Sequence, residues 1–513
     1  MKKNLLCLAT FFCFSIITAQ ATAANGVKAI PLVDRIEYSD MLFGQFIEHF
    51  HTQIYGGIFD PGSELSDESG FRTDVIEALR EIKVPIVRWP GGCFVSSYHW
   101  LDGVGRERYP IFDKTWRVED PNTFGTDEFV AWCRKVGAEP YICTNAGTGT
   151  PEEMSDWVEY CNLDAGKFAR MRQENGHREP FDVKYWSVGN ENWGGFELGA
   201  KTVGEWGPFV RESSKLMRAV SPDAKLFAAA TPDRGWTLPL LQAAGQWLDY
   251  ISIHCYWDGL HAVNNVSPYM ACMMRTEGPQ QNIEQTINVL DESGYRGRIK
   301  IAFDEWNLRG WHHPWHGDFR RQMDIEAREK NDINATYTMA DALFSACFLN
   351  ACLRNAQDVE IACFSPIVNT RGAVFVHPRG IVKRTTFHTF KMYANMLEKY
   401  VVPLEQSVER LEDGGASTPV LDVVLTGNEA GMRYVYAVVN KHPEKEIALT
   451  LDFEGLGKKV PKKLKGTVLS GSGPDDYNDI GAEERVVPYE NTFAVKDGAV
   501  SLPPHSLVFL TVE

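Results

Sequence analysis

The sequence has 513 residues, of which 44% are hydrophobic and 23% charged, and this length suits one large domain followed by a smaller one. With 52 basic and 68 acidic side chains, the formal net charge is −16 at pH 7. Nucleic acids and anionic membranes are bound through basic surfaces, so this charge argues against both as partners.

The N-terminal residues have the pattern of a signal peptide. Lys2 and Lys3 precede an apolar run over residues 5–17, and small residues at 21–23 provide a cleavage site. We therefore predict a signal peptide over residues 1–23 and an exported protein, either periplasmic or extracellular. Removal of this segment leaves nine of the 11 cysteines, with no CxxC pair and no disulfide framework.

Eight short apolar runs alternate with helical patterns between residues 41 and 384. In chain order the runs are LFGQFIEH, VPIVRWPGG, EPYICTNAG, YWSVGNEN, KLFAAATP, YISIHCYW, RIKIAFDEWN and EIACFSPIVN. The segments between them include DVIEALREI, TDEFVAWCRKV, FVRESSKLMRAV and NIEQTINVLDES, which read as amphipathic helices. Eight strands that alternate with helices predict a (β/α)8 TIM barrel over residues 41–384.

From residue 385 onward the sequence changes to short strands bounded by Gly, Asn and Asp. Examples are VLDVVLTG, RYVYAVVNK, EIALTLDFEG and HSLVFLTVE. This spacing predicts an antiparallel β-sandwich over residues 385–513. The segment at 24–40 also has strand character, and we expect it to join the sandwich because chain termini often meet in space.

Two of the predicted barrel strands deliver a glutamate at their ends, Glu191 after the fourth run and Glu305 in the seventh. Catalytic residues of such barrels lie at the C-terminal ends of the strands. Glycoside hydrolysis needs two carboxyl groups that flank one bond, one to protonate the leaving oxygen and one to attack or to activate water. We therefore predict a glycoside hydrolase with this catalytic pair. No GxSxG elbow is present, which argues against a serine hydrolase.

Polar residues at the ends of other runs are expected close to this pair. Arg88 would hold a carboxylate ionised, Tyr256 would donate a hydrogen bond to the nucleophile, and His254 faces the same end of the barrel. The segment HHPWH at 312–316 is read as an aromatic loop over the pocket rather than a zinc site, because no third carboxylate ligand follows at helical spacing. We expect neither a metal nor a cofactor.

Several longer stretches are similar to one known family. They are FGQFIEHF, VPIVRWPGGCFVSSYHWLDGVG, FGTDEFVAWCRKVGAEPYICTNAGTGTPEE, KYWSVGNENWG, SIHCYW and AFDEWN. Together they resemble the α-L-arabinofuranosidases of glycoside hydrolase family 51 over essentially the whole mature length. The resemblance implies a barrel with a C-terminal β-sandwich, no metal, and often a hexamer. It also implies retaining removal of terminal α-L-arabinofuranosyl residues from arabinan, arabinoxylan or arabino-oligosaccharides.

The same resemblance implies roles for the catalytic pair and its supports. Glu191 would be the general acid and base, and Glu305 the nucleophile. Arg88 and Tyr256 would support the nucleophile. These assignments agree with the pair found from the strand ends alone.

Substrate-binding residues are implied in the same way. Glu48 and Asn190 would hydrogen-bond sugar hydroxyls, and Trp100 would contact the substrate. Cys93 takes a sugar-facing position in PGGCF, where the family more commonly has PGGNF. A thiol is a weaker donor than an amide, so a looser contact is expected there.

Two other functions remain open at this point. A β-endoglucanase or β-xylosidase on the same barrel would need an open cleft with several aromatic subsites, because fold alone does not determine substrate. A non-catalytic carbohydrate-binding protein would use the aromatic surface, but binding alone would not require a pair of carboxyl groups.

Overall fold

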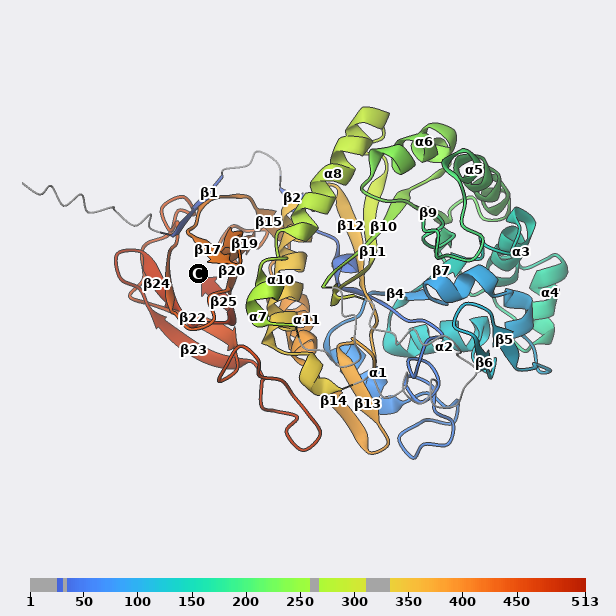
Figure 1. Ribbon diagram of the computed structural model, residues 1–513, viewed down its shortest axis with the longest axis horizontal. Coiled ribbons are helices and arrows are strands. Elements are labelled where there is room, and N and C mark those ends of the chain that lie inside the picture. The colour runs from blue at the N-terminus through green and yellow to red at the C-terminus, as the bar shows by residue number, and fades with distance from the viewer. Residues whose placement is uncertain (1–24, 31–34, 259–266, 311–332) are drawn as a thin grey trace, which may run out of the picture.

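The computed structural model describes residues 25–30, 35–258, 267–310 and 333–513. The predicted signal peptide and the HHPWH segment lie outside these residues. A barrel surrounded by helices lies beside a body of antiparallel strands that holds the C-terminus (Figure 1). Among the described residues, no helix combines the length and apolar character needed to span a bilayer.

The eight predicted barrel runs form eight parallel strands of one closed barrel. They are β3 (Gly44–Phe46), β4 (Ile86–Trp89), β7 (Glu139–Thr144), β8 (Tyr185–Val188), β9 (Lys225–Ala229), β10 (Tyr250–Asp258), β11 (Lys300–Arg309) and β12 (Val359–Phe364). Each strand pairs with its neighbours in chain order, and β12 closes the circle against β3. The predicted TIM barrel is therefore confirmed.

Helices cover the outside of the barrel. They are α1 (Thr73–Glu81), α2 (Thr126–Val136), α3 (Pro151–Asn162), α4 (Lys167–Glu174), α5 (Val203–Val220), α6 (Arg234–Ala244), α7 (Tyr269–Met273), α8 (Gly278–Ser293), α10 (Met339–Arg354) and α11 (Thr385–Met396). Most are amphipathic. The exception is α10, in which every residue before Arg354 is buried, because it lies between the barrel and the sandwich (Figure 1).

The helix α11 belongs to the barrel. It follows the eighth barrel strand, and the hydroxyl groups of Thr385, Thr389 and Tyr393, at intervals of four residues, donate to successive backbone carbonyls of α10 and its N-cap. The barrel therefore continues to Met396, twelve residues beyond the boundary expected at residue 384.

The sandwich consists of two sheets. The larger contains β2 (Ile36–Glu37), β15 (Tyr400–Val402), β19 (Leu421–Gly427), β20 (Tyr434–Asn440), β25 (Ser506–Val512), β22 (Lys463–Leu469) and β23 (Tyr489–Ala494). The smaller contains β16 (Leu404–Ser407), β1 (Gly26–Ala29), β21 (Ile447–Thr450) and β24 (Ala499–Leu502). Both sheets are antiparallel except for the parallel pairing of β1 with β21. Since β1 pairs with β16 and β2 with β15, the N-terminal segment joins the sandwich as predicted.

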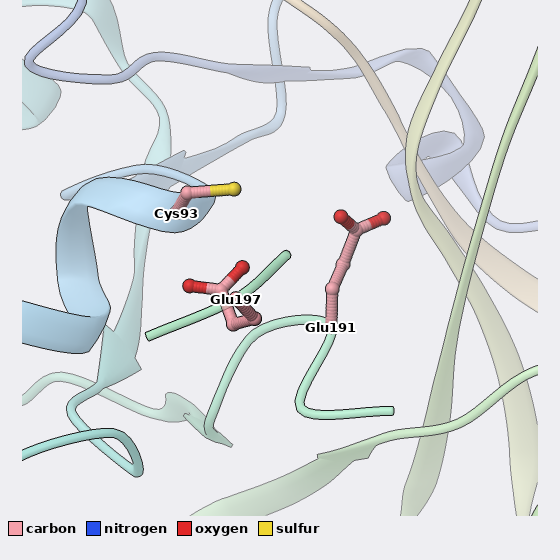
Figure 2. A group of neighbouring side chains, drawn as sticks. All are labelled: Cys93, Glu191 and Glu197. Carbon is pink, nitrogen blue, oxygen red and sulfur yellow. The ribbon is translucent and has the colours of Figure 1, made fainter. Parts of the chain in front are cut away.

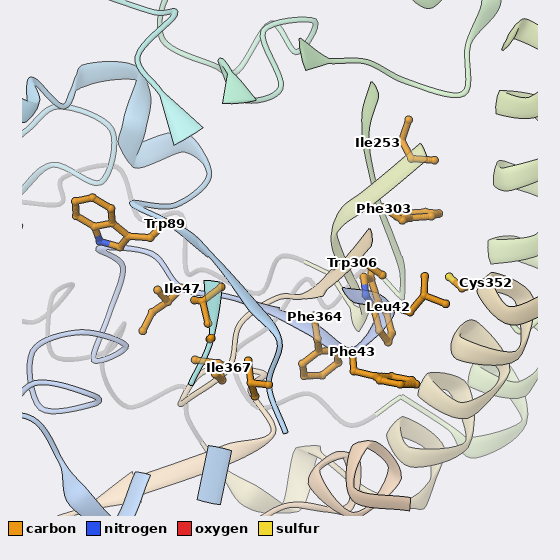
Figure 3. Packing of buried hydrophobic residues seen from close by; sticks show 14 of the residues in the cluster. Leu42, Phe43, Ile47, Trp89, Ile253, Phe303, Trp306, Cys352, Phe364 and Ile367 are labelled. Carbon is orange, nitrogen blue, oxygen red and sulfur yellow. The ribbon is translucent and has the colours of Figure 1, made fainter. Parts of the chain in front are cut away.

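Trp306, which follows the glutamate Glu305 on the seventh barrel strand, is part of the core. Trp306 is fully buried among other hydrophobic side chains of the core (Figure 3). Its ring stacks on Phe348 of α10 at a centroid distance of 3.5 Å. Neighbouring side chains of a strand point to opposite faces, so Trp306 points outward while Glu305 points into the barrel. The aromatic residue anchors the strand that carries the glutamate.

Candidate active site

Glu305 lies on β11, where three side chains hold its carboxyl group. Arg88 donates to its Oε2 at 2.8 Å and the hydroxyl of Tyr256 donates to its Oε1 at 2.7 Å, while His254 Nδ1 lies 3.6 Å from Oε2. Burial alone would raise the pKa of this carboxyl, but the positive charges of His254 and Arg88 and the hydrogen bonds outweigh it and lower the pKa. Glu305 is therefore ionised, as a nucleophile requires.

His254 connects both glutamates to a buried aspartate. Its Nδ1 lies 3.0 Å from Oε1 of Glu191, and its Nε2 lies 3.1 Å from the Ser252 hydroxyl and 3.4 Å from Asp304. Burial opposes the charge of the imidazolium, but Glu305, Asp304 and Glu191 together raise its pKa to about 10. His254 is thus a cation at neutral pH. A histidine in the core of a protein is usually neutral, so this charge indicates a role in the site.

Asp304 is buried inside the barrel next to Glu305. It accepts hydrogen bonds from Tyr141 at 2.6 Å and Ser252 at 2.7 Å. Successive strand residues normally face opposite sides, but the pairing of β11 with β12 shifts register between Phe303 and Trp306. This bulge turns two consecutive carboxyl groups into the barrel.

Glu191 lies in a tight turn after β8. Its φ of +44° is in the left-handed region, which a residue with a side chain adopts rarely and often at functional sites. The turn is closed by Asn192, whose side chain accepts from the Asn190 amide, and by the Gly194 amide, which donates to the Glu191 carbonyl at 2.7 Å. A carboxylate oxygen of Glu191 lies within 4.8 Å of one of Glu305.

Arg88 ties the two glutamate-bearing segments together. Besides Glu305, its guanidinium donates to Oδ1 of Asn190 at 2.6 Å, and it lies 3.6 Å from Asp304. The arginine is fully buried, with charged or polar partners on several sides. The predicted support of a carboxylate by Arg88 therefore has a geometric basis, and the same contact fixes the residue that precedes Glu191.

Glu48 lies next to Glu305 at the end of β3. Its Oε1 accepts from the Phe94 amide at 3.0 Å and from the Trp116 indole at 3.2 Å. Burial and the charge of Glu305 raise its pKa to about 8, so the carboxyl holds a proton at neutral pH and can donate as well as accept. Gly91 permits this approach, because a Cβ there would lie 2.2 Å from Glu48 Cγ.

Cys93 and Trp100 follow the same strand but have different surroundings. Cys93 Sγ lies within 4.8 Å of a carboxylate oxygen of Glu191, so it borders the site. Trp100 is 1% exposed, its ring lies parallel to that of Trp157, and its indole donates to the Glu153 carbonyl. The expected substrate contact of Trp100 is therefore wrong: the 3-10 turn over Trp100–Gly103 directs this ring into the core.

Three further polar residues at the site were not assigned from the sequence. Arg371 donates to the Tyr256 hydroxyl at 3.1 Å and its guanidinium lies over the Tyr256 ring. Glu197 accepts from Asn190 Nδ2 at 3.3 Å, and burial together with the charge of Glu191 raises its pKa to about 7. Asp304 stands beside Glu305 in the sequence, but no role was assigned to it there.

Comparison with known proteins gives consistent matches. The α-L-arabinofuranosidase 1 domain matches residues 78–273, and the α-L-arabinofuranosidase C-terminal domain matches residues 304–506. An α-L-arabinofuranosidase C from Emericella nidulans is 35% identical, over 95% of this chain and 97% of the relative. An intracellular exo-α-(1→5)-L-arabinofuranosidase from Acetivibrio thermocellus is 30% identical, over 92% and 97%. The solved family 51 α-L-arabinofuranosidase from Thermotoga petrophila superposes with a TM-score of 0.80 at 33% identity, over 96% of this chain and all of that one.

The barrel brings together two carboxyl groups, one in the turn after its fourth strand and one on its seventh strand, and the second is held ionised. This arrangement defines the protein as a glycoside hydrolase. Similarity at this level over nearly the whole chain then identifies the family. The chain belongs to the α-L-arabinofuranosidases of glycoside hydrolase family 51.

Proposed function

We propose that this enzyme is an exo-acting, retaining α-L-arabinofuranosidase that removes terminal α-L-arabinofuranosyl residues from arabinan, arabinoxylan or arabino-oligosaccharides. One observation carries the mechanism: a carboxylate oxygen of Glu191 lies within 4.8 Å of one of the ionised Glu305. Retaining enzymes hold their two carboxyl groups about 5–5.5 Å apart, whereas inverting enzymes need about 6.5–9.5 Å to admit a water.

In the first step, Glu305 attacks the anomeric carbon and forms a glycosyl ester while the bond to the leaving oxygen breaks. Glu191 gives its proton to that oxygen, so the alcohol leaves neutral. His254, 3.0 Å from Glu191, stabilises the carboxylate that this transfer produces. In the second step, Glu191 takes a proton from water, the hydroxide oxygen bonds to the anomeric carbon, and Glu305 is released.

The leaving-group side of the site carries exposed aromatic surface. Phe196 is 64% exposed and its ring meets that of Trp193 edge-on at 5.8 Å, in the turn that continues from Glu191. Since the general acid must contact the leaving oxygen, these rings lie on the side where the rest of the glycan departs. A flat exposed ring beside that position suits the face of a second sugar.

The stereochemistry of the product tests the mechanism directly. We expect proton NMR of the first turnovers on 4-nitrophenyl α-L-arabinofuranoside to show α-L-arabinofuranose before mutarotation. If the β-anomer appears first, double displacement is wrong even though the enzyme is an arabinofuranosidase. If the wild type does not hydrolyse this substrate but cleaves glucan or xylan oligomers, the enzyme is a β-endoglucanase or β-xylosidase and not an arabinofuranosidase.

The pH dependence should respond to Tyr256, because its hydroxyl hydrogen-bonds the ionised form of Glu305 at 2.7 Å. Since this hydrogen bond helps to lower the pKa of Glu305, Tyr256→Phe should raise that pKa and move the acid limb of the kcat/KM profile to higher pH. A hydrogen bond to a charged group contributes about 1.5–3 kcal/mol, so kcat/KM at the optimum should fall roughly 10- to 100-fold. An acid limb at the wild-type position would show that Tyr256 does not tune the nucleophile.

Two further properties are part of the proposal. Residues 1–23 would direct the enzyme out of the cytoplasm, where arabinose-containing polymers and their fragments are encountered. Assembly into a hexamer, implied by the family resemblance, is proposed on that resemblance alone.

A further inference from the structure

Three potential metal ligands converge on one side of the acid/base residue. Cys93 opens the 3-10 helix Cys93–Ser97 that follows β4, while Glu191 and Glu197 both lie in the segment after β8. Figure 2 shows the Cys93 thiol and the Glu197 carboxylate close together, with the Glu191 carboxylate across from them. One ligand atom from each residue lies within 4.8 Å of those of the other two.

Glu197 is a buried carboxylate with one hydrogen bond of regular geometry among the described residues. The side chain is 5% exposed, and its Oε2 accepts from Asn190 at 3.3 Å. Its Oε1 is buried and accepts no hydrogen bond of regular geometry, although the Ser96 hydroxyl and the Cys93 thiol interact with the carboxylate. A buried carboxylate oxygen without a hydrogen bond of regular geometry is costly, and a bound cation is one way to satisfy it.

We propose that Cys93, Glu191 and Glu197 bind a single thiophilic divalent cation such as Zn²⁺, and that this cation inhibits the enzyme by occupying Glu191. The cation is an inhibitor here and takes no part in the reaction. The donor set fits zinc, which binds thiolate at about 2.3 Å and carboxylate oxygen at about 2.0–2.2 Å, with a fourth position left for water. Atoms that share such an ion lie about 3–4 Å apart, so small side-chain rotations from the present spacing would complete the site.

A second cluster of potential metal ligands in the active site is less suited to a cation. Glu191, His254 and Glu305 also bring their ligand atoms within 4.8 Å of one another. Both ring nitrogens of His254 are already engaged, however, and Glu305 is bonded to Arg88 and Tyr256. A cation there would have to displace these contacts and lie close to a buried guanidinium, whereas on the cysteine side only Glu191 is bonded to a positive side chain, that of His254.

The inhibition follows from the role proposed for Glu191 and rests on it. A carboxylate coordinated to a metal carries no proton, so it cannot protonate the leaving oxygen. Binding of the cation does not depend on that role. A spectroscopic measurement of binding therefore separates failure of this proposal from failure of the mechanism.

The test uses the mature enzyme with Co²⁺ as a spectroscopic probe and Zn²⁺ as the inhibitor. We expect one Co²⁺ per chain and a thiolate-to-cobalt charge-transfer absorption that Cys93→Ser abolishes. Cys255→Ser is the matched control, because Cys255 is the other partly exposed thiol among the described residues, and it should retain the band. Zn²⁺ should inhibit the wild type reversibly, with activity restored by a chelator.

Glu197→Gln provides a second test that keeps the shape of the side chain. It should weaken Zn²⁺ inhibition, measured against the variant's own uninhibited rate, by at least the roughly 10- to 100-fold that loss of an outer-shell partner costs a metal site. Cobalt absorption that persists in Cys93→Ser, or zinc inhibition lost on substitution of His254 but not of Glu197, would overturn the proposal. Absence of any cobalt band in a folded, active wild type would do the same.

Discussion

Glu305→Ala should abolish turnover of 4-nitrophenyl α-L-arabinofuranoside. The substitution removes the atom that attacks the anomeric carbon and leaves Arg88 and His254 with an unbalanced positive charge in the barrel. Loss of a covalent nucleophile in other hydrolases costs about 10⁶-fold in kcat, so a fall of roughly 10⁴- to 10⁶-fold is expected here. Steady-state kinetics with released 4-nitrophenol measure it.

A matched control separates chemistry from folding in this experiment. Glu179 is an exposed glutamate whose contact with Arg178 lies on the surface, so Glu179→Ala should keep wild-type activity. Both variants should melt cooperatively. If a folded Glu305→Ala enzyme retains more than about a tenth of the wild-type kcat, Glu305 is not the nucleophile.

Glu191→Ala should reduce kcat by roughly 10²- to 10⁴-fold, the usual contribution of general acid and base catalysis. The loss should be greater for an arabino-oligosaccharide than for the 4-nitrophenyl glycoside, because a sugar alkoxide needs the proton more than 4-nitrophenolate does. Azide should restore turnover and yield an arabinosyl azide, since a small anion can attack the glycosyl ester without a general base.

Azide also distinguishes the two glutamates. With Glu191→Ala the glycosyl ester on Glu305 still forms, and azide then attacks that ester. The two displacements each invert the anomeric carbon, so the arabinosyl azide should retain the α-configuration. An α-configured azide from Glu305→Ala would reverse the two assignments, because a nucleophile variant can react with azide only by one displacement, which gives the β-azide.

The barrel was predictable because each of its strands is short and nearly continuous in apolar residues, with a helical pattern before the next one. The boundary with the sandwich was harder to place. The α11 sequence, TTFHTFKMYANM, has polar hydroxyl groups where a barrel helix normally has apolar ones. Those hydroxyl groups bond to α10 carbonyls, a pairing that no local pattern reveals.

The catalytic pair was predictable from strand ends, but its surroundings depend on contacts distant in the sequence. The inward turn of Asp304 depends on a bulge, which strand alternation cannot indicate. Arg371 comes from the segment after the eighth strand and reaches Tyr256 only when the barrel closes. Trp100 was misassigned because resemblance transfers a position but not the direction of its side chain.

The buried helix α10 makes the catalytic domain inseparable from its neighbour. This helix follows the strand that carries Glu305, and Asn350 and Arg354 near its end bond to Asp422 of the sandwich. A chain cut after the barrel would leave an apolar helix face in water beside the nucleophile strand. The barrel and the sandwich therefore form one cooperative unit. When this barrel is combined with other modules, in evolution or by engineering, the sandwich has to be included.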